Sequence, residues 1–293
     1  MEEIECEHMH RVVRKDISLE RRPFAGLARP VHRVLFGLFL AQFTLVWAGS
    51  WLAGGDLRTA NWPQGLLVVL ATATLLASMT LQLPGQNVIL ASVLIAVISG
   101  AAQAIGALTG IPFGPYVYTS EIGQQLFEAL PWAVPMVWII AILSSRGVAR
   151  LALRPWRSTR DYGFRLIGLT AVLVVWLDFG LEPFATRVKH FWRWNPTKMR
   201  SDWYGTPWVN FLGWMLTALL ILAFVTPSLI NKKPVKPPPP DYHPLIVWLL
   251  LNLLFATGTA TSRLWLAVGL ITTGSAVAAF WAIRGGTAKD GCS

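Results

Sequence analysis

Long apolar runs with few or no charges are the feature that most limits what this chain can fold into. Blocks of roughly 17 to 23 mostly apolar residues recur along the sequence, and each is long enough to cross a hydrocarbon core of about 30 Å as a helix. Isolated helices of this kind have no polar face to offer to water, so a soluble domain is excluded. The sequence therefore predicts an all-α fold, a polytopic membrane helix bundle.

Eight of these runs are expected to span the membrane. Their predicted ranges are 33–53, 65–83, 87–109, 130–145, 164–181, 208–226, 244–260 and 264–283. Pro84-Gly85 and Ser262-Arg263 mark tight connections, whereas Pro237 to Pro240 predicts a stiff, polyproline-like linker. The chain is thus divided into a tail, a membrane domain and a short second tail, at 1–32, 33–283 and 284–293.

The basic residues are unevenly divided between the two sides that these spans define. With the amino terminus inside, 18 of the 25 lysines and arginines fall on the inner side and 7 on the outer side. The positive-inside rule then predicts that both termini are cytoplasmic, with 1–32 a basic tail that can lie on anionic lipid. Because this topology accounts for most of the net charge of +10, nucleic acid is not expected as a partner. The expected location is the cell (plasma) membrane, as a multi-pass protein surrounded by lipid.

The sequence gives no sign of a cofactor or a metal. Cys6 and Cys292 lie at the two ends, and no predicted span contains a lysine that could form a retinal Schiff base. There is no glycine-rich dinucleotide fingerprint, no paired aspartate-rich motif for magnesium diphosphate, and no histidine cluster of the di-iron type. We therefore expect chemistry that uses neither a redox cofactor nor a metal ion.

The stretch from Trp176 to Trp214 carries more acidic and aromatic residues than a membrane connection requires. Asp178 follows an apolar run, where it costs a few kcal/mol unless it faces the bundle interior, a cavity or a partner. Its structural alternative is pairing with Arg187 or capping of a neighbouring helix. Because Pro183 is expected to take Glu182 out of helical geometry, the two carboxylates are not expected to share a helical face.

A second unusual segment, 110–131, is expected on the same membrane face. It is rich in glycine, proline and aromatic residues and contains no lysine or arginine. Thr119 or Ser120 can cap a short helix with Glu121 in its first turn, and this structural role competes with a functional one for Glu121. An interfacial belt explains most of the tryptophans of the two segments, whereas a few rings could stabilise a positive charge. If the two segments meet, they can form an interfacial active site.

An ordered set of residues runs through both segments. It comprises Gly114-Pro115-Tyr116-Val117-Tyr118, Val134-Pro135, Trp138, Asp178, Glu182-Pro183, Ala185, Trp192, Trp194, Tyr204-Gly205-Thr206-Pro207, Asn210-Phe211 and Gly213-Trp214. In this set the chain resembles a carotenoid-biosynthesis membrane family that includes the CruF-type carotenoid 1,2-hydratases and the archaeal bisanhydrobacterioruberin hydratases. The resemblance covers about residues 90–225.

The resemblance implies a hydro-lyase that adds water to the terminal double bond of an acyclic carotenoid end group, such as that of lycopene or gamma-carotene, and gives a tertiary alcohol. Such chemistry needs an acid to protonate the less substituted carbon, a stabilised tertiary cation and a captured water. Asp178 is the expected acid, with Glu121 or Glu182 orienting the water. The expected residues for cation stabilisation or substrate binding are Tyr116, Tyr118, Trp194, Tyr204, Asn210 and Trp214.

Other functions stay open at this point. A non-catalytic carotenoid-binding or assembly protein would use the same apolar groove but tolerate loss of the carboxylates. A carotenoid cyclase would share the protonation step and end in ring closure. A transporter should show inverted repeats, and no convincing internal repeat is found. A carotenoid could enter sideways from the bilayer, and other enzymes of carotenoid synthesis could be partners.

Overall fold

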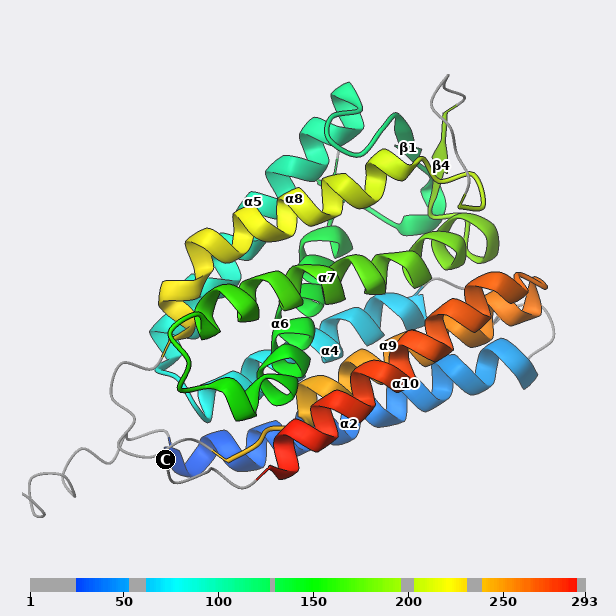
Figure 1. Cartoon of the computed structure of the whole chain (residues 1–293). Helices are drawn as coiled ribbons and strands as arrows, with labels where there is room; N and C mark the ends of the chain where they lie inside the picture. The colour runs from blue at the N-terminus through cyan, green and yellow to red at the C-terminus, as the bar shows by residue number, and fades with distance from the viewer. Residues whose placement is uncertain (1–24, 53–61, 127–129, 196–202, 231–238, 289–293) are drawn as a thin grey trace, which may run out of the picture.

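The computed structural model describes residues 25–52, 62–126, 130–195, 203–230 and 239–288. Within these ranges eight helices are long and apolar enough to cross a membrane, which confirms the predicted all-α polytopic bundle. Figure 1 shows them arranged as one bundle. Their bounds are α2 (Ala25–Leu52), α4 (Trp62–Thr80), α5 (Gly85–Thr109), α6 (Ala133–Ala152), α7 (Tyr162–Pro183), α8 (Trp208–Val225), α9 (His243–Thr261) and α10 (Trp265–Thr287).

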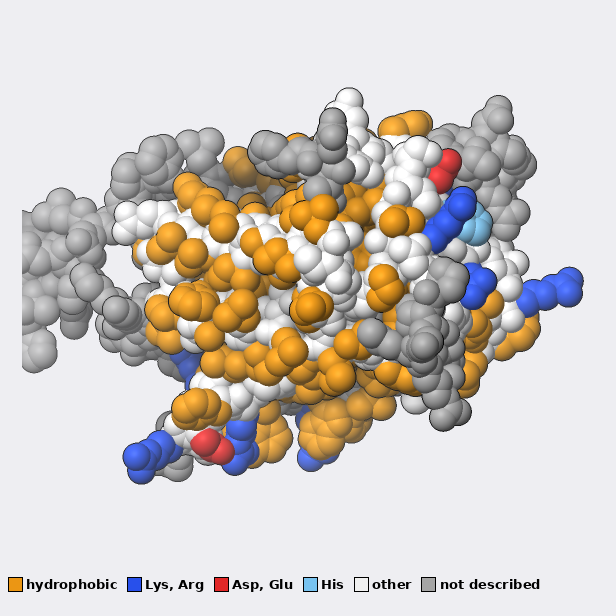
Figure 2. Space-filling view, turned by 90° about the horizontal axis from the view of Figure 1, so that it is seen from above, with side chains coloured by type: hydrophobic (Ala, Val, Ile, Leu, Met, Phe, Trp, Pro, Cys, Tyr) orange, Lys and Arg blue, Asp and Glu red, His pale blue; other side chains and the backbone are white. Residues whose placement is uncertain are grey.

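Helix α6 is the centre of the bundle, because it contacts α4, α5, α7, α9 and α10. It buries Trp138, Ile142 and the hydroxyls of Ser144 and Ser145. The outer helices instead expose large apolar side chains, such as Phe280 on α10. In Figure 2 apolar side chains are spread across the visible face, and charged side chains lie mainly toward its margins. A bilayer would cover an apolar surface of this kind at little cost.

The two ends of the bundle differ. Helix α2 begins and α10 ends at the same end, as an even number of spans requires, whereas the short strands labelled β1 and β4 lie at the other end (Figure 1). The cytoplasmic location of the end where α2 begins and α10 ends stays a prediction of the charge distribution.

A short antiparallel ladder joins the two unusual segments of the sequence. Strand β1 (Tyr116–Tyr118) pairs with β4 (Trp192–Trp194), with Tyr116 opposite Trp194 and Tyr118 opposite Trp192. A second small pair, β2 (Gln125–Leu126) with β3 (Leu130–Pro131), follows a 3₁₀ turn at Ser120–Ile122. The expectation that segments 110–131 and 176–214 meet is therefore confirmed.

Helix α7 continues through Pro183, so the expectation that Glu182 leaves helical geometry was wrong. Proline has no N–H, and the carbonyl of Phe179 therefore loses its helical donor. The indole N–H of Trp203 donates to that carbonyl instead, at 3.0 Å. Membrane helices tolerate proline when a neighbour satisfies the freed backbone group in this way. The helix then passes into a π-helical turn at Phe184–Val188, and Glu182 stays one turn beyond Asp178.

Helix α6 was predicted to end at 145 but ends at Ala152, which places Arg146 and Arg150 inside the helix. The predicted helix was too short because a run without charges shows only which residues suit lipid. The helix itself can continue beyond that run where other helices cover its charged side chains. Here Arg146 is buried and donates to the carbonyl of Leu229. Helix α2 likewise begins at Ala25, eight residues before its predicted start.

Candidate active site

A cavity of about 510 Å³ lies beneath the β1–β4 ladder, with walls from α4, α5, α6, α7, α8 and α9. Its size is that of a pocket for a small organic group. Eight of the nine predicted site residues line it: Tyr116, Tyr118, Glu121, Asp178, Glu182, Trp194, Asn210 and Trp214. The fold therefore brings together side chains that are spread over almost 100 residues of sequence.

Two buried carboxyl groups form the polar centre of this cavity. Asp178 and Glu182 are 0% and 2% exposed, and they lie one turn apart on α7. The side-chain amide of Asn210, at the start of α8, donates to Oδ2 of Asp178 at 2.8 Å and to Oε1 of Glu182 at 3.0 Å. No described cation forms an ion pair with either carboxyl group. Since burial of an uncompensated charge is costly, the shared amide is a large part of what makes this pair tolerable.

The two carboxyl groups have different surroundings. Oε2 of Glu182 accepts hydrogen bonds from the indoles of Trp192 and Trp194, at 3.2 and 3.0 Å, and from the hydroxyl of Thr206 at 3.1 Å. With Asn210, Glu182 thus has four donors, and this many donors suits an anion. Asp178 has one donor, and its Oδ1 has no partner among the described residues. An oxygen without a donor suits a carboxyl group that carries its own proton.

Aromatic side chains of the β1–β4 ladder form one wall of the cavity. Because side chains alternate along a strand, Tyr116 and Tyr118 share a face, and they meet Trp194 and Trp192 at ring distances of 5.4 and 6.4 Å. Both tyrosine hydroxyls donate to Oε1 of Gln103, at 2.7 and 3.1 Å. Burial raises the pKa of Tyr116 to about 12 and raises that of Tyr118 well above its usual value. Both phenols are therefore neutral at ordinary pH.

A second aromatic wall comes from the helices. Trp138 of α6 and Trp214 of α8 stack with ring centroids 4.1 Å apart and an interplanar angle of 16°. Phe113 lies on the same cavity and packs against Gly213, where an added Cβ would lie 2.6 Å from the phenyl ring. Glycine at 213 therefore lets the loop before β1 approach α8 closely.

Glu121 lies on the cavity wall and is exposed, so it belongs to the mouth and not to the buried centre. The hydroxyl oxygen of Thr119 accepts the Glu121 backbone N–H at 3.2 Å, and this confirms the predicted cap of the short helix. Glu121 therefore belongs to the capped turn and also lies on the cavity wall.

Tyr204 is the predicted site residue that does not line the cavity. Its backbone is left-handed, with a φ of 54°, and its hydroxyl accepts the backbone N–H of Ala267 at the start of α10. Its carbonyl accepts two hydrogen bonds from Arg187. The suggestion that Arg187 pairs with Asp178 was therefore wrong, because the guanidinium is engaged by this turn.

Three polar residues of the site were not singled out for these roles from the sequence. They are Gln103, which holds both tyrosine hydroxyls, and Thr206 and Trp192, which donate to Glu182. Gln103 could have been found, since a buried amide inside a membrane span requires an explanation. The partners of Thr206 and Trp192 could not, because they depend on how the loop folds back over α7.

Comparison with known proteins gives a consistent result. A family model described as "Carotenoid biosynthesis protein" matches residues 64–277. A curated protein from Haloarcula japonica named bisanhydrobacterioruberin hydratase is 27% identical over 136 residues, which is 46% of this chain and 44% of that protein. The match thus covers less than half the length of this relative. No solved structure matches the chain.

Proposed function

This chain belongs to the carotenoid biosynthesis protein family, and from that premise we propose that it adds water to the terminal double bond of an acyclic carotenoid end group. The observation that carries the proposal is the buried pair of Asp178 and Glu182, joined by one amide in a cavity lined by aromatic rings. The name of the Haloarcula japonica relative supports water addition as the reaction class.

The cavity volume supports an end group as the bound part of the substrate. About 510 Å³ is too small for a whole carotenoid but suits a terminal isoprenoid segment, as in lycopene or gamma-carotene. Trp62 and Leu66 of α4 both line the cavity and are exposed on the bundle, at 62% and 41%. An opening beside α4 would therefore admit the polyene from the bilayer and leave the rest of the chain among lipid.

In the first step Asp178 donates the proton. The O–H bond at Oδ1 breaks, a C–H bond forms at the less substituted alkene carbon, and the π electrons supply that bond. The product is a tertiary cation and an Asp178 carboxylate. The assignment rests on Oδ1 having no hydrogen-bond partner among the described residues and on Asp178 being one of the residues that line the cavity.

In the second step water captures the cation. Glu182, held as an anion by four donors, stabilises the positive charge together with the faces of Tyr116 and Trp194. A water molecule oriented by Glu121 at the mouth, or by Glu182, forms the C–O bond. The proton that the water then loses passes to the Asp178 carboxylate, so the acid is restored and the net reaction is addition of one water.

The test is Asp178→Asn, with product analysis in a host that makes lycopene. The parent protein is expected to give a carotenoid heavier by one water. The variant should lose roughly a hundredfold or more of this product, since loss of a positioned acid typically costs about 10² to 10⁴ in rate. Asp161→Asn is the matched control, because Asp161 is an exposed acid that pairs with Arg165 at the other end of α7.

Full activity of Asp178→Asn would overturn the assignment of the proton donor. A ring-closed product without added water would identify a cyclase instead. Recovery of bound, unchanged carotenoid from both the parent protein and the variant would indicate a binding protein.

A further inference from the structure

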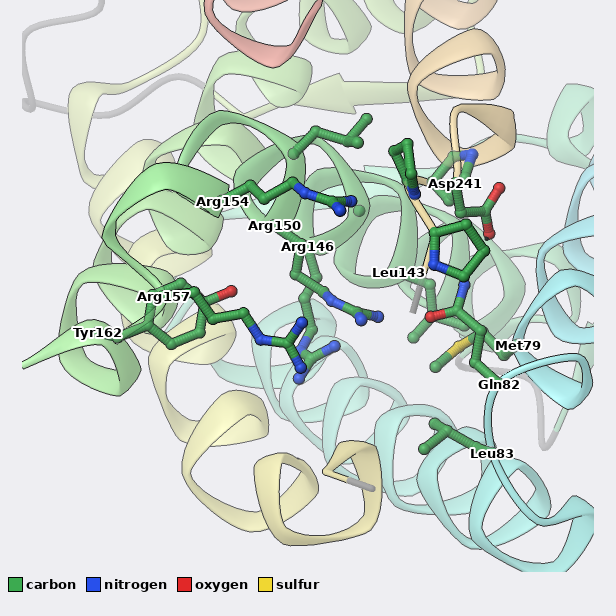
Figure 3. Close-up of a pocket in the computed structure, with 15 residues that line it drawn as sticks. Met79, Gln82, Leu83, Leu143, Arg146, Arg150, Arg154, Arg157, Tyr162 and Asp241 are labelled. Carbon is green, nitrogen blue, oxygen red and sulfur yellow. Dashed lines mark hydrogen bonds between the residues drawn. The ribbon is translucent and has the colours of Figure 1, made fainter. Parts of the chain in front are cut away.

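A second, smaller cavity lies at the opposite end of α6 from the candidate active site. Figure 3 shows this second cavity in close-up. It has a volume of about 70 Å³. Four arginines line it, namely Arg146, Arg150, Arg154 and Arg157, with Tyr162 beside them. In Figure 3 these residues approach the cavity from one side, and Met79, Gln82 and Asp241 lie on the other. We refer to it as the arginine cavity.

Arg146 is the most unusual member, because it is only 5% exposed. One of its donors, Nη2, reaches the carbonyl of Leu229 at 3.2 Å. Within the described part of the chain no carboxylate forms an ion pair with Arg146 or with Arg150, which lies one helical turn further along α6. A guanidinium has five N–H donors, so one bond to a carbonyl leaves donors of Arg146 that can serve a ligand in the cavity it lines.

The acid in the wall of this cavity is already engaged. Asp241 accepts the backbone N–H of His243 at its Oδ1, and its Oδ2 accepts the hydroxyl of Ser78 and the amide of Gln82. Burial favours the neutral form of Asp241, but the hydrogen bonds from His243 and Ser78 outweigh it and hold the pKa of the carboxyl group below its usual value. Among the described residues, one anion with several partners thus lies in the same wall as Arg146, Arg150 and Arg157, and positive side chains outnumber negative ones.

The cavity has the size and chemistry for one tetrahedral anion. A water-sized group needs roughly 10 to 15 Å³ of such volume, so about 70 Å³ holds roughly five heavy atoms. Guanidinium groups match phosphate oxygens through paired N–H donors, which makes arginine the preferred residue for phosphate recognition. We propose that the arginine cavity binds a phosphate group.

The position of the cavity is consistent with two sources of that phosphate. It lies where α6 and the turn Arg154–Trp156 reach the end of the bundle, and for helices that span a bilayer this end is expected at the level of the lipid headgroups. Basic pockets between membrane helices bind anionic headgroups there. A soluble phosphate ester would meet the same donors. This proposal does not depend on the hydratase reaction.

The experiment uses the full-length protein purified in an uncharged detergent. Thermal unfolding and native mass spectrometry are measured with short-chain phosphatidylglycerol, with glycerol 3-phosphate and with inorganic phosphate, at matched ionic strength. Arg150→Gln and Arg157→Gln are compared with Arg165→Gln, a half-exposed arginine at the same end that does not line the cavity. Arg157 is exposed, so its variant is expected to fold even if replacement of a buried arginine does not.

Binding of at least one phosphate compound, weakened at least tenfold by Arg157→Gln or Arg150→Gln and unchanged by Arg165→Gln, is the expected result. Binding of phosphatidylglycerol alone identifies a lipid headgroup as the source, whereas binding of glycerol 3-phosphate or inorganic phosphate identifies a soluble ligand. If all three variants bound these compounds as tightly as the parent protein does, or if the parent protein bound none of them, the proposal would be overturned.

Discussion

Asn210 is the residue on which the buried acid pair depends. One primary amide carries two N–H groups, and here they serve Asp178 and Glu182 together. No other described residue donates to Asp178, so the amide links the two side chains and compensates part of the cost of their burial. The stability of the site and its chemistry should therefore respond to the same substitution.

We expect Asn210→Ala to lower the free energy of unfolding by about 1 to 3 kcal/mol, since it leaves buried acceptors without a donor. Hydration activity should fall in parallel. Asn252→Ala is a matched control: Asn252 is 1% exposed and hydrogen-bonded, but it does not line the cavity. Its variant should lose stability while the folded fraction keeps its activity. Thermal unfolding and product assays measure the two effects, and unchanged activity of Asn210→Ala would contradict the role of the amide.

The buried hydroxyl of Tyr116, in the wall formed by the β1–β4 ladder, predicts that the protein loses stability at alkaline pH. Burial raises the pKa of Tyr116 from about 10 in the unfolded chain to about 12 in the folded one. Between these values the folded state binds more protons than the unfolded state, so stability is complete below about pH 10 and falls as the pH rises toward 12. Tyr116→Phe removes this contribution, and its stability should fall less steeply with pH than that of the parent protein. Unfolding midpoints from pH 9 to 12 measure the difference, and identical slopes would refute it.

At the scale of elements, α7 owes its last turn to a residue outside the helix. Pro183 removes the donor to the carbonyl of Phe179, and Trp203 supplies another from the loop before α8. This contact keeps Glu182 in register with Asp178. The loop before α8 therefore contributes to the stability of α7.

A double-mutant cycle can test this coupling. Trp203→Phe should destabilise the protein by about 1 to 3 kcal/mol, because it leaves the Phe179 carbonyl without its donor. Adding Pro183→Ala returns a backbone N–H that can bond to the same carbonyl, so the double variant should recover part of the loss. Unfolding midpoints of the four proteins give the coupling energy, and strictly additive effects would show that the two residues act independently.

At the scale of the whole molecule, the two cavities lie at opposite ends of the bundle. The candidate active site lies at the end where β1 and β4 meet, and the arginine cavity at the end where α2 begins and α10 ends (Figure 1). The eight spans of the described residues place the start of α2 and the end of α10 on one side. The charge distribution then predicts that the arginine cavity lies on the cytoplasmic side and the candidate active site on the opposite side.

The native cysteines allow a direct test of this orientation. Cys6 and Cys292 are the chain's two cysteines, one near each terminus, and both lie outside the described residues. A membrane-impermeant maleimide should leave intact cells unlabelled and label the protein only after the membrane is opened. Ser120→Cys, at an exposed position of the other end, should be labelled in intact cells. The reverse pattern would invert the topology.

The sequence by itself determined the membrane bundle, its eight spans and the two segments that meet. The physical reason is that each apolar run must lie in lipid whatever the rest of the chain does, so its own sequence reveals it. Acidic and aromatic residues such as Asp178, Glu121 and Tyr116 are then conspicuous beside these runs.

Only the tertiary structure decided how those residues are used. The course of α7 past Pro183, the turning of Tyr204 toward α10, the burial of Arg146 and the sharing of Asn210 between two acids each depend on a partner from a distant element. A local pattern specifies a residue's own preference, whereas a buried polar group takes whichever donor or acceptor the packed helices bring within reach.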